Sequence, residues 1–318
     1  MLKVKITDRS METASIVSLI LQAVDDEQLP DYKAGSHIDV SISNNLTRQY
    51  SLCDNRQDSS CYRVAILKDA NSRGGSIKVH QDFKIGDEIS ISQPRNCFSL
   101  NGSDKRSILI AGGIGITPLM SMAYDLENQG AEFELHYFCR NKEQAAFYEE
   151  LKHASFSDKV HFYFDDKRTS NSEKLNSILK SPSGSVGLYT CGPQGFMDSV
   201  IQLACEHQWL AENIHKEFFS ASESIQSDAD KDFIIELAQS NQTIVVSAEQ
   251  TALEALELAG IDVDSSCEQG ICGACILNVI SGTPDHRDNY FSDEEKALNN
   301  QFTPCCSRAK SEKLILDL

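Results

Sequence analysis

Positive charge is scarce in this sequence of 318 residues. It has 29 Lys and Arg against 47 Asp and Glu, so its formal net charge is −18 at pH 7. A field of this sign repels the phosphates of nucleic acids and the anionic head groups of membranes. We therefore expect neither a nucleic acid nor a membrane among the partners of this protein.

Long apolar runs are also missing. The most apolar stretch, residues 108–124, contains Thr117 and Pro118, whereas a membrane-spanning helix needs about 18 consecutive apolar residues. The first residues alternate apolar and charged side chains, and they lack the apolar core of a signal peptide. We expect a cytoplasmic protein, in which the odd number of 11 cysteines favours a metal or cofactor site over a disulfide framework.

The first two segments of the chain differ in pattern. Residues 1 to about 100 contain short strands between turn residues, which is typical of an antiparallel barrel or sandwich. From about residue 104 to 220, apolar runs alternate with helical periodicity, which indicates a doubly wound parallel sheet. The strands predicted in the first segment are 2–6, 15–24, 37–42, 48–53, 62–67 and 88–92.

The last segment is predicted to be a small α+β domain behind a linker. Residues 220–231 are rich in Ser and Asp, which indicates the linker. Residues 232–249 resemble a hairpin that turns near Asn241, and residues 251–260 resemble a helix that ends at glycine. From residue 230 onward there are 16 acidic and 6 basic residues, so more than half of the excess negative charge lies here.

Three cysteines, Cys267, Cys272 and Cys275, stand within nine residues of this last segment. Their spacing, C-x4-C-x2-C, is that of plant-type ferredoxins, which hold a [2Fe-2S] cluster. A zinc site would more often show two separated C-x2-C pairs, and a redox pair would lie at a strand-to-helix step. We favour the cluster and keep zinc and redox thiols as the alternatives.

The fourth cluster ligand is predicted to be Cys305. The 29 residues between Cys275 and Cys305 match the plant-type separation. Adjacent residues of an extended segment point to opposite sides, so Cys306 would face the packing of its own domain. The small residues Gly270 and Gly273 agree with a loop whose backbone approaches a cluster closely.

A helix start is predicted between these cysteines, at residues 291–298. Ser292 is a helix cap and Glu295 completes a capping box, while Asp293 and Glu294 suit the positive end of the helix. We expect a structural helix whose carboxylates also suit a basic partner.

The middle segment carries a glycine-rich turn after a predicted strand. Gly112, Gly113 and Gly115 precede Thr117, a predicted helix cap, and Pro118, the predicted first helical residue. A helix start of this kind can bind a pyrophosphate through backbone N–H groups, although a plain tight turn is the alternative. A second such turn, at residues 190–196, would face the same crevice of a parallel sheet.

The first segment carries a possible phosphate site. Along the strand at 48–52, Arg48 and Tyr50 point to one side and Ser51 to the other. Gly75 precedes Ser76, which is a good cap for a short phosphate-binding helix, and Arg48 would supply a bidentate contact. The alternative interpretation is that Tyr50 only packs in the barrel.

Several motifs, in this order along the chain, resemble those of the phthalate dioxygenase reductase family. They are "RQYSL", "RGGS", "AGGIGITP", "CGPQGFM", "HKEFF" and "SCEQGICGAC", and the likeness covers essentially the whole chain. The resemblance implies three domains: an antiparallel β-barrel flavin domain at 1–101, a doubly wound α/β NAD domain at 102–225, and a β-grasp plant-type ferredoxin domain at 226–318.

The resemblance also implies a path for electrons, in the service of aromatic catabolism. NADH gives a hydride to FMN, the [2Fe-2S] cluster takes single electrons, and a terminal oxygenase with a Rieske centre receives them. Two rival functions stay open: a reductase for another acceptor, such as a cytochrome or ferredoxin, and a metal-stabilised binding protein without enzymatic activity.

Individual site residues follow from the same resemblance. The residues implied for FMN are Arg48, Tyr50, Ser51, Gly75 and Ser76. Those implied for NADH are Gly113, Thr117, Cys191, Gly192 and Pro193, with Phe219 as an aromatic shield of the flavin. Ser51 and Cys191 are the catalytic candidates, although Cys191 can also be a plain buried thiol. The cysteines assigned to packing are Cys53, Cys61, Cys97, Cys139 and Cys205.

The preferred nucleotide is predicted to be NADH rather than NADPH. Asp165 and Asp166 end a predicted strand at the position where NADPH-dependent relatives carry residues that bind the extra phosphate. Carboxylates there can accept from ribose hydroxyls and would repel a 2′-phosphate. The neighbouring Lys167 and Arg168 weaken this repulsion.

Overall fold

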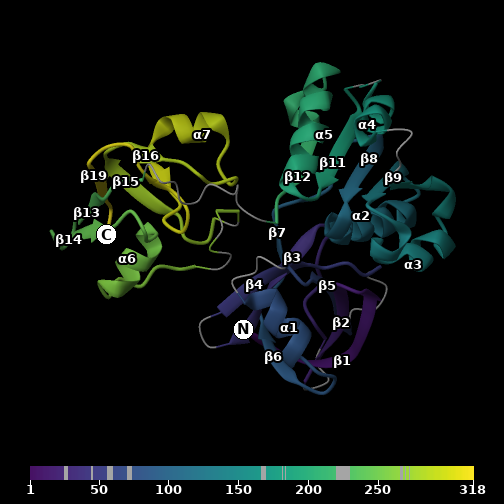
Figure 1. The fold of residues 1–318 in the computed structure, drawn as a ribbon, viewed down its shortest axis with the longest axis horizontal. Helices are drawn as coiled ribbons and strands as arrows, with labels where there is room; N and C mark the ends of the chain where they lie inside the picture. Colours follow the sequence, from purple (N-terminus) through teal and green to yellow (C-terminus); the bar gives the residue numbers. More distant parts are fainter. Residues whose placement is uncertain are drawn as a thin grey trace. The chain divides into compact units, whose positions relative to one another are not determined.

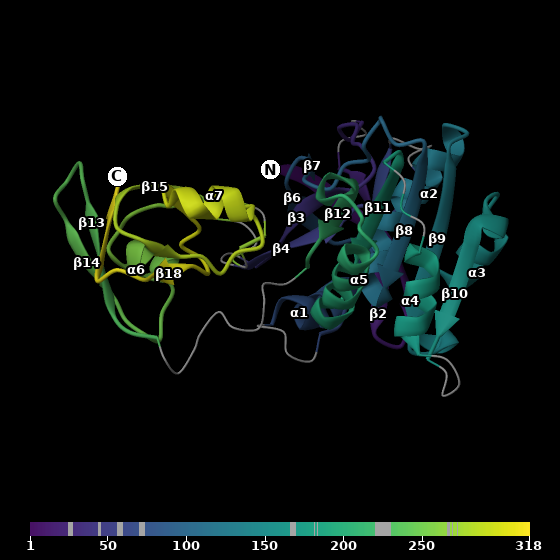
Figure 2. The same ribbon diagram turned by 90° about the horizontal axis from the view of Figure 1, so that it is seen from above.

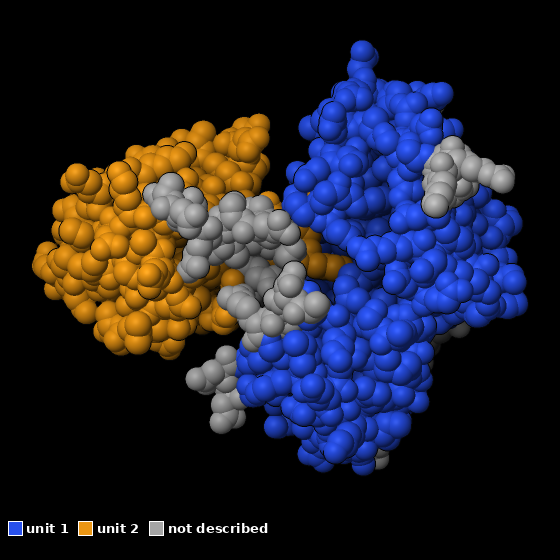
Figure 3. Space-filling model, in the orientation of Figure 1, with its two compact units in different colours: residues 1–217 blue, residues 218–318 orange. Residues whose placement is uncertain are grey.

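The computed structural model divides the chain into two compact units, residues 1–217 (unit 1) and residues 218–318 (unit 2), coloured separately in Figure 3. Unit 1 contains the predicted barrel and the parallel sheet, so the division at residues 101 and 225 stays a prediction. The structure describes every residue except 25–27, 44–45, 56–59, 70–73, 166–169, 181, 183, 220–229, 266–267, 269 and 272.

The first sheet of unit 1 is an antiparallel barrel. Its strands follow the order β4-β3-β6-β1-β2-β5, and β7 pairs with β3. A bridge between Leu52 and Val64 joins the two outer strands and closes the sheet, so the structure has a barrel and not a sandwich. The elements are β1 (Leu2–Thr13), β2 (Ile16–Ala23), β3 (Ser36–Ser43), β4 (Leu46–Ser51), β5 (Cys61–Leu67), α1 (Gly75–Asp82), β6 (Glu88–Ile91) and β7 (Arg95–Asn96).

The second sheet of unit 1 is parallel, in the order β10-β9-β8-β11-β12 (Figure 2). The chain proceeds from β8 outward to β10 and then returns to place β11 on the other side of β8. Doubly wound sheets bind ligands at such a reversal, beyond the carboxyl ends of the strands. The strands are β8 (Arg106–Gly112), β9 (Glu132–Cys139), β10 (Val160–Phe164), β11 (Val186–Cys191) and β12 (Ile214–Glu217).

Helices pack against this parallel sheet. Two of them, α4 and α5, lie side by side in both ribbon views and share a core with Ile108, Ile110 and Leu188 (Figures 1 and 2). Another, α2, packs against β8, β9 and β11. The helices are α2 (Ile116–Asn128), α3 (Tyr148–His153), α4 (Asn171–Leu179) and α5 (Gln194–Glu206), and short 3₁₀ turns cover Gly113–Gly115, Lys142–Gln144, Ser157–Lys159 and Ala211–Asn213.

Unit 2 has a mixed sheet in the order β14-β13-β19-β15-β17, with a small ladder of β16 and β18. The predicted hairpin is confirmed, because β13 pairs with β14 and Asn241 takes a left-handed turn conformation with φ of 55°. The strands are β13 (Phe233–Leu237), β14 (Thr243–Val246), β15 (Leu277–Ser281), β16 (Pro284–Asp285), β17 (Gln301–Phe302), β18 (Arg308–Ala309) and β19 (Lys313–Leu316).

Two helices accompany the sheet of unit 2, α6 (Ala252–Leu258) and α7 (Asp293–Leu298). Capping boxes start both helices, and the predicted box of Ser292 and Glu295 is confirmed. Beyond α6, Gly260 has φ of 80°, as expected for a glycine that ends a helix. Within the described part of the chain, every helix is too short or too polar to span a membrane.

Candidate functional site

The first candidate site lies where α1 begins, beside β4. A Cβ built on Gly75, the first helical residue, would lie 2.9 Å from Cγ and 3.2 Å from Nε of Arg48. Glycine therefore leaves the room that the arginine side chain occupies. Gly74 caps the helix with φ of 100°, and Arg48 Nη1 donates to the Thr47 carbonyl at 2.7 Å. Backbone N–H groups of a helix start and a guanidinium lie together here, an arrangement that fits a phosphate group such as that of FMN.

The prediction that Ser76 caps this helix was wrong. Ser76 is the second helical residue, and its Oγ accepts a hydrogen bond from the Asp69 backbone N–H at 3.1 Å. The capping residue is Gly74, because only glycine adopts its left-handed conformation without strain.

Tyr50 lies on β4, two residues beyond Arg48, with its side chain half-buried against the barrel core. Burial raises the pKa of its phenol, and the nearby Arg48 charge only partly offsets this effect. Arg48 and Tyr50 oppose Val40 and Ile38 of β3, so they lie on one side of β4 as predicted.

Ser51 links the two sheets of unit 1 through a hydrogen bond. It ends β4, is 4% exposed, and donates from Oγ to Oε2 of Glu217 at 3.3 Å. Glu217 ends β12, where it pairs with Cys191 at the end of β11. The two catalytic candidates, Ser51 and Cys191, are thus brought to either side of one carboxyl group.

Glu217 is the residue that the sequence analysis missed. Desolvation raises the pKa of its carboxyl group to about 8, and the hydrogen bond from Ser51 lowers it only in part. Burial, followed by the charge of Glu217, raises the pKa of the Cys191 thiol well above its ordinary value. The motif "HKEFF" contains Glu217, but its spacing gives no sign of the partner Ser51, which is 166 positions away.

The two glycine-rich turns of the parallel sheet lie against each other. A Cβ on Gly115 would lie 2.2 Å from the Cys191 carbonyl oxygen and 2.6 Å from the Gly192 backbone nitrogen. Gly113, at the start of the first turn, has φ of 54°. In the second turn Gly192 follows β11 and Pro193 caps α5. Both turns therefore stand at the reversal of strand order, where backbone groups can receive a dinucleotide.

The prediction that Thr117 caps α2 was also wrong. Helix α2 begins at Ile116 with Gly115 as its cap, so Thr117 is the second helical residue and Pro118 the third. The Thr117 side chain is buried, and its Oγ1 donates to the Ile114 carbonyl at 3.0 Å. It stabilises the turn that precedes the helix instead of capping the helix.

The remaining nucleotide candidates lie near strand ends. Asp165 directly follows β10, is exposed, and accepts from the Asn171 side chain at 2.9 Å. Asp166 lies outside the described residues. Phe219 is half-buried and stands two residues past β12, within unit 2.

The candidate metal centre of unit 2 is seen in part. Cys267 and Cys272 lie outside the described residues, whereas Cys275 and Cys305 are 4% and 3% exposed. Hydrogen bonds with the thiols of Cys275 and Cys306, together with burial, raise the pKa of Cys305. The Cys305 sulfur thus contacts the sulfurs of both Cys275 and Cys306.

The loop around these sulfurs suits a cluster. The described residues between 261 and 276 form neither helix nor strand, and Gly270 and Gly273 have φ of 68° and 70°. Only residues without a Cβ adopt such angles freely, which lets the backbone approach a bound group. Buried thiols beside a loop with left-handed glycines therefore fit a [2Fe-2S] cluster.

Cys306 has a different environment from Cys305. Its Sγ contacts Oγ1 of Thr303 at 3.3 Å and Oγ of Ser307 at 3.8 Å. A Cβ on Gly270 would lie 2.3 Å from this sulfur, so Cys306 fills the space beside the loop backbone. Cys306 therefore has hydroxyl partners of its own within unit 2.

Comparisons with known proteins agree with this geometry. Residues 235–310 match the family model of the 2Fe-2S iron-sulfur cluster binding domain. The vanillate O-demethylase oxidoreductase of Acinetobacter baylyi is 47% identical over 306 residues, which cover 96% of this chain and 95% of that protein. The solved structure of phthalate dioxygenase reductase matches with a TM-score of 0.78 and 36% identity, covering 100% of this chain and 98% of that one.

The chain belongs to the phthalate dioxygenase reductase family. As a member of this family it is an electron-transfer oxidoreductase with NADH, FMN and a [2Fe-2S] cluster as cofactors, and it is the reductase component of an oxygenase system. Its architecture is that of the family: a β-barrel flavin domain, a doubly wound NAD domain and a β-grasp ferredoxin domain. A module within a type IV self-sufficient cytochrome P450 monooxygenase has the same fold, with a TM-score of 0.84 and 34% identity over 100% of this chain and 41% of that one.

Proposed function

We propose that this chain reduces a Rieske non-haem iron oxygenase of the vanillate O-demethylase type. The observation that carries the proposal is the identity of 47% to a vanillate O-demethylase oxidoreductase across nearly the full length of both chains. The net charge of −18 supports a protein partner with a basic surface over a nucleic acid or an anionic membrane.

The domain division and the site residues are part of the proposal. Residues 1–101 bind FMN, residues 102–225 bind NADH, and residues 226–318 hold the cluster. FMN, when bound, supplies the conversion from two-electron hydride donation to single-electron transfer. Arg48 and the N–H groups of α1 hold the FMN phosphate, and Ser51, with its partner Glu217, offers a hydroxyl group to the flavin.

The remaining residues take the nucleotide and the metal. Gly113, Thr117, Gly192 and Pro193 line the two adjoining turns that receive NADH, with Cys191 at their centre and Phe219 as the shield of the flavin. The exposed Asp165, with Asp166, selects NADH at the ribose. The cluster ligands are Cys267, Cys272, Cys275 and Cys305, and the contact between the thiols of Cys275 and Cys305 supports this set.

Two experiments test the function in sequence. The purified protein should show flavin bands over the broad absorption of a cluster, and NADH should bleach both under anaerobic conditions. A colourless protein that contains zinc would contradict the proposal and favour a binding protein. Reconstitution with a purified vanillate-type Rieske oxygenase should then give product in proportion to the NADH consumed.

A second acceptor class has one observation in its favour. The module of a self-sufficient cytochrome P450 has the same fold at a TM-score of 0.84, so the fold by itself serves more than one class of oxygenase. Parallel assays with a Rieske oxygenase and a cytochrome P450 as acceptors distinguish the two. Faster reduction of the cytochrome P450 at equal concentration would overturn the Rieske assignment.

A further inference from the structure

An exposed aromatic ring lies on the predicted cluster loop. A Cβ built on Gly273 would lie 2.4 Å from Cε2 and 2.5 Å from Cζ of Tyr290, so the ring covers the backbone of Gly273. Gly273 stands between Cys272 and Cys275, two of the proposed ligands. Tyr290 is nevertheless 44% exposed. Tyr290 thus reaches from the backbone of the ligand loop to the protein surface.

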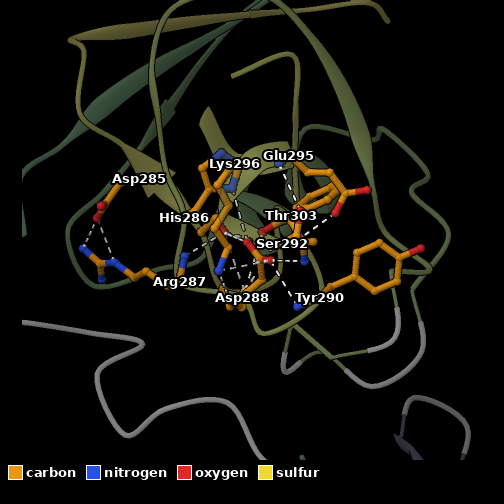
Figure 4. A network of polar contacts seen from close by, with 12 residues as sticks. Asp285, His286, Arg287, Asp288, Tyr290, Ser292, Glu295, Lys296 and Thr303 are labelled. Atoms are coloured by element: carbon orange, nitrogen blue, oxygen red, sulfur yellow. Dashed lines mark hydrogen bonds and ion pairs between the residues drawn. The ribbon is translucent and has the colours of Figure 1, made fainter. Parts of the chain in front are cut away.

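A buried network fixes the backbone that carries Tyr290 (Figure 4). The carboxylate of Asp288 is buried and accepts from the backbone N–H groups of Tyr290 at 3.2 Å and Phe291 at 2.9 Å. It also accepts from Oγ of Ser307 at 3.3 Å, and Lys296 Nζ donates to the Asp288 carbonyl at 2.7 Å. Figure 4 shows the ring of Tyr290 projecting away from this network.

The buried ring of Phe291 adds a second constraint on Tyr290. The two rings meet edge to face with their centroids 5.2 Å apart. A side chain held in this way loses little conformational entropy when a partner covers it, so it is well suited to an interface. Interface residues of this kind, aromatic and pre-organised, tend to carry much of the binding energy.

Helix α7 begins three residues after Tyr290, and its exposed side chains extend the surface. Asp293 and Glu294 are exposed and have no hydrogen bond or ion pair with any described residue, whereas Glu295 forms the capping box with Ser292. Leu298 is 67% exposed and lies one turn after Glu294, on the same face of the helix. We call Tyr290, Asp293, Glu294 and Leu298 the Tyr290 surface.

We propose that the Tyr290 surface is where unit 2 docks on the electron acceptor. The occupant is the oxygenase component of the proposed function, on which this inference rests, and it meets the surface with basic and apolar side chains. An acceptor would take electrons most readily at a surface close to the cluster ligands, and Tyr290 joins the backbone of Gly273, which stands between two proposed ligands, to the surface. The carboxylates of α7 attract a basic acceptor and orient it during approach.

The experiment uses the full-length holoenzyme and cytochrome c as a basic one-electron acceptor protein. The variants are Tyr290→Ala, Tyr290→Phe and the pair Asp293→Asn with Glu294→Gln. The matched control is Glu312→Gln, which removes one exposed carboxylate next to β13, a strand that both ribbon views place across unit 2 from α7 (Figures 1 and 2). Iron content and NADH:ferricyanide activity report whether the cofactors are intact, because ferricyanide is small and needs no docking surface.

The expected result is a rise in KM for cytochrome c of about tenfold in Tyr290→Ala, with Tyr290→Phe close to wild type. The carboxylate pair should raise KM about threefold and flatten its dependence on salt, since surface charge acts mainly on association. Isothermal titration calorimetry of the oxidised proteins should show the same order of Kd values without any turnover.

Two outcomes separate the docking proposal from the proposed function. If wild-type protein with intact cofactors fails to reduce its cluster with NADH, the function itself is wrong. If wild-type protein works and both Tyr290→Ala and the carboxylate pair match Glu312→Gln in KM and Kd, the docking surface is overturned. Should Tyr290→Ala lose iron, the carboxylate pair, which lies outside the ligand loop, still decides the question.

Discussion

The residues around the Glu217 carboxyl group in unit 1 stand at the ends of regular strands, whereas the described cluster cysteines of unit 2 stand in loops. Ser51, Cys191 and Glu217 end β4, β11 and β12, so the pairing of two sheets fixes their separation. Cys275 and Cys305 follow no such element, and the buried carboxylate of Asp288 helps to shape their surroundings. A hydride donor needs precise orientation, and the sheets can supply it without a bound group. The positions of sulfur ligands in a loop, in contrast, depend on the metal that they bind.

The largest expected effect tests the loop side of this comparison. Cys305→Ser should remove the cluster, because a [2Fe-2S] cluster of this type is held by four thiolates and the variant supplies only three, while flavin and NADH binding in unit 1 persist. Cys306→Ser should keep the cluster, since its sulfur already packs against Thr303 and Ser307. Iron and sulfide analysis with visible spectra measures both. Equal losses, or loss only with Cys306→Ser, would contradict the ligand assignment.

The next effect concerns the phosphate site at α1. Arg48→Ala should weaken FMN binding by about 10- to 150-fold, because a charge-assisted contact is worth roughly 1.5 to 3 kcal/mol. The cluster should stay at full occupancy. Lys84→Ala, an exposed change just beyond α1, is the control. Flavin retention after gel filtration gives the measurement, and equal retention in wild type and Arg48→Ala would count against this site.

Nucleotide choice should show a smaller effect at the end of β10. A carboxylate beside a 2′-phosphate costs up to about 4 kcal/mol before salt screens it, so we expect about a tenfold preference for NADH over NADPH in kcat/KM. Asp165→Asn should narrow this preference. Asp158→Asn, at the opposite end of the same strand, should leave it unchanged. Equal kcat/KM values for the two nucleotides in wild type would remove the role given to these aspartates.

The smallest effect is a pH dependence within the sheets of unit 1. The folded protein holds a proton on Glu217 up to about pH 8, whereas the unfolded chain releases it near pH 4.5. Stability from this group is therefore present below pH 4.5 and is lost as pH rises toward 8. Glu217→Gln keeps a neutral side chain, so its melting temperature should fall less over this range than that of wild type. Circular dichroism measures the melting temperature at each pH. In the exposed control Glu212→Gln, the melting temperature should fall with pH as steeply as in wild type. If the melting temperatures of all three proteins fell equally with pH, the raised pKa of Glu217 would be refuted.

Much of the fold could be predicted because its signals are local. Alternation of apolar and polar residues placed β2, β3 and β5 to within a few residues, and the capping box of Ser292 needs only neighbours in sequence. Strand β1 extends to Thr13, beyond the predicted end at residue 6. The prediction stopped early because the second half of the strand is mostly polar and exposed. Strand β12 escaped prediction altogether, since its four residues are mostly polar and gain their place by pairing with β11.

The site was harder to predict where backbone geometry or distant contacts decide it. Ser76 and Thr117 have side chains that commonly cap helices, yet Gly74 and Gly115 hold those positions because the turns demand their backbone angles or close approach. Glu217 meets Ser51 only through the packing of two sheets. A single sequence carries no local signal of such a meeting.

The outer strands of the barrel and of the unit 2 sheet differ in their exposure to self-association. The barrel joins its outer strands through Leu52 and Val64, whereas β14 forms an outer strand of the unit 2 sheet. Val245 on β14 is 60% exposed and has β-branched neighbours, a combination that invites pairing with a strand from another molecule. The strand is only four residues long, which limits the length of any such pairing. Aggregation on storage should therefore begin in unit 2, and a lysine in place of Val245 is the simplest safeguard against it.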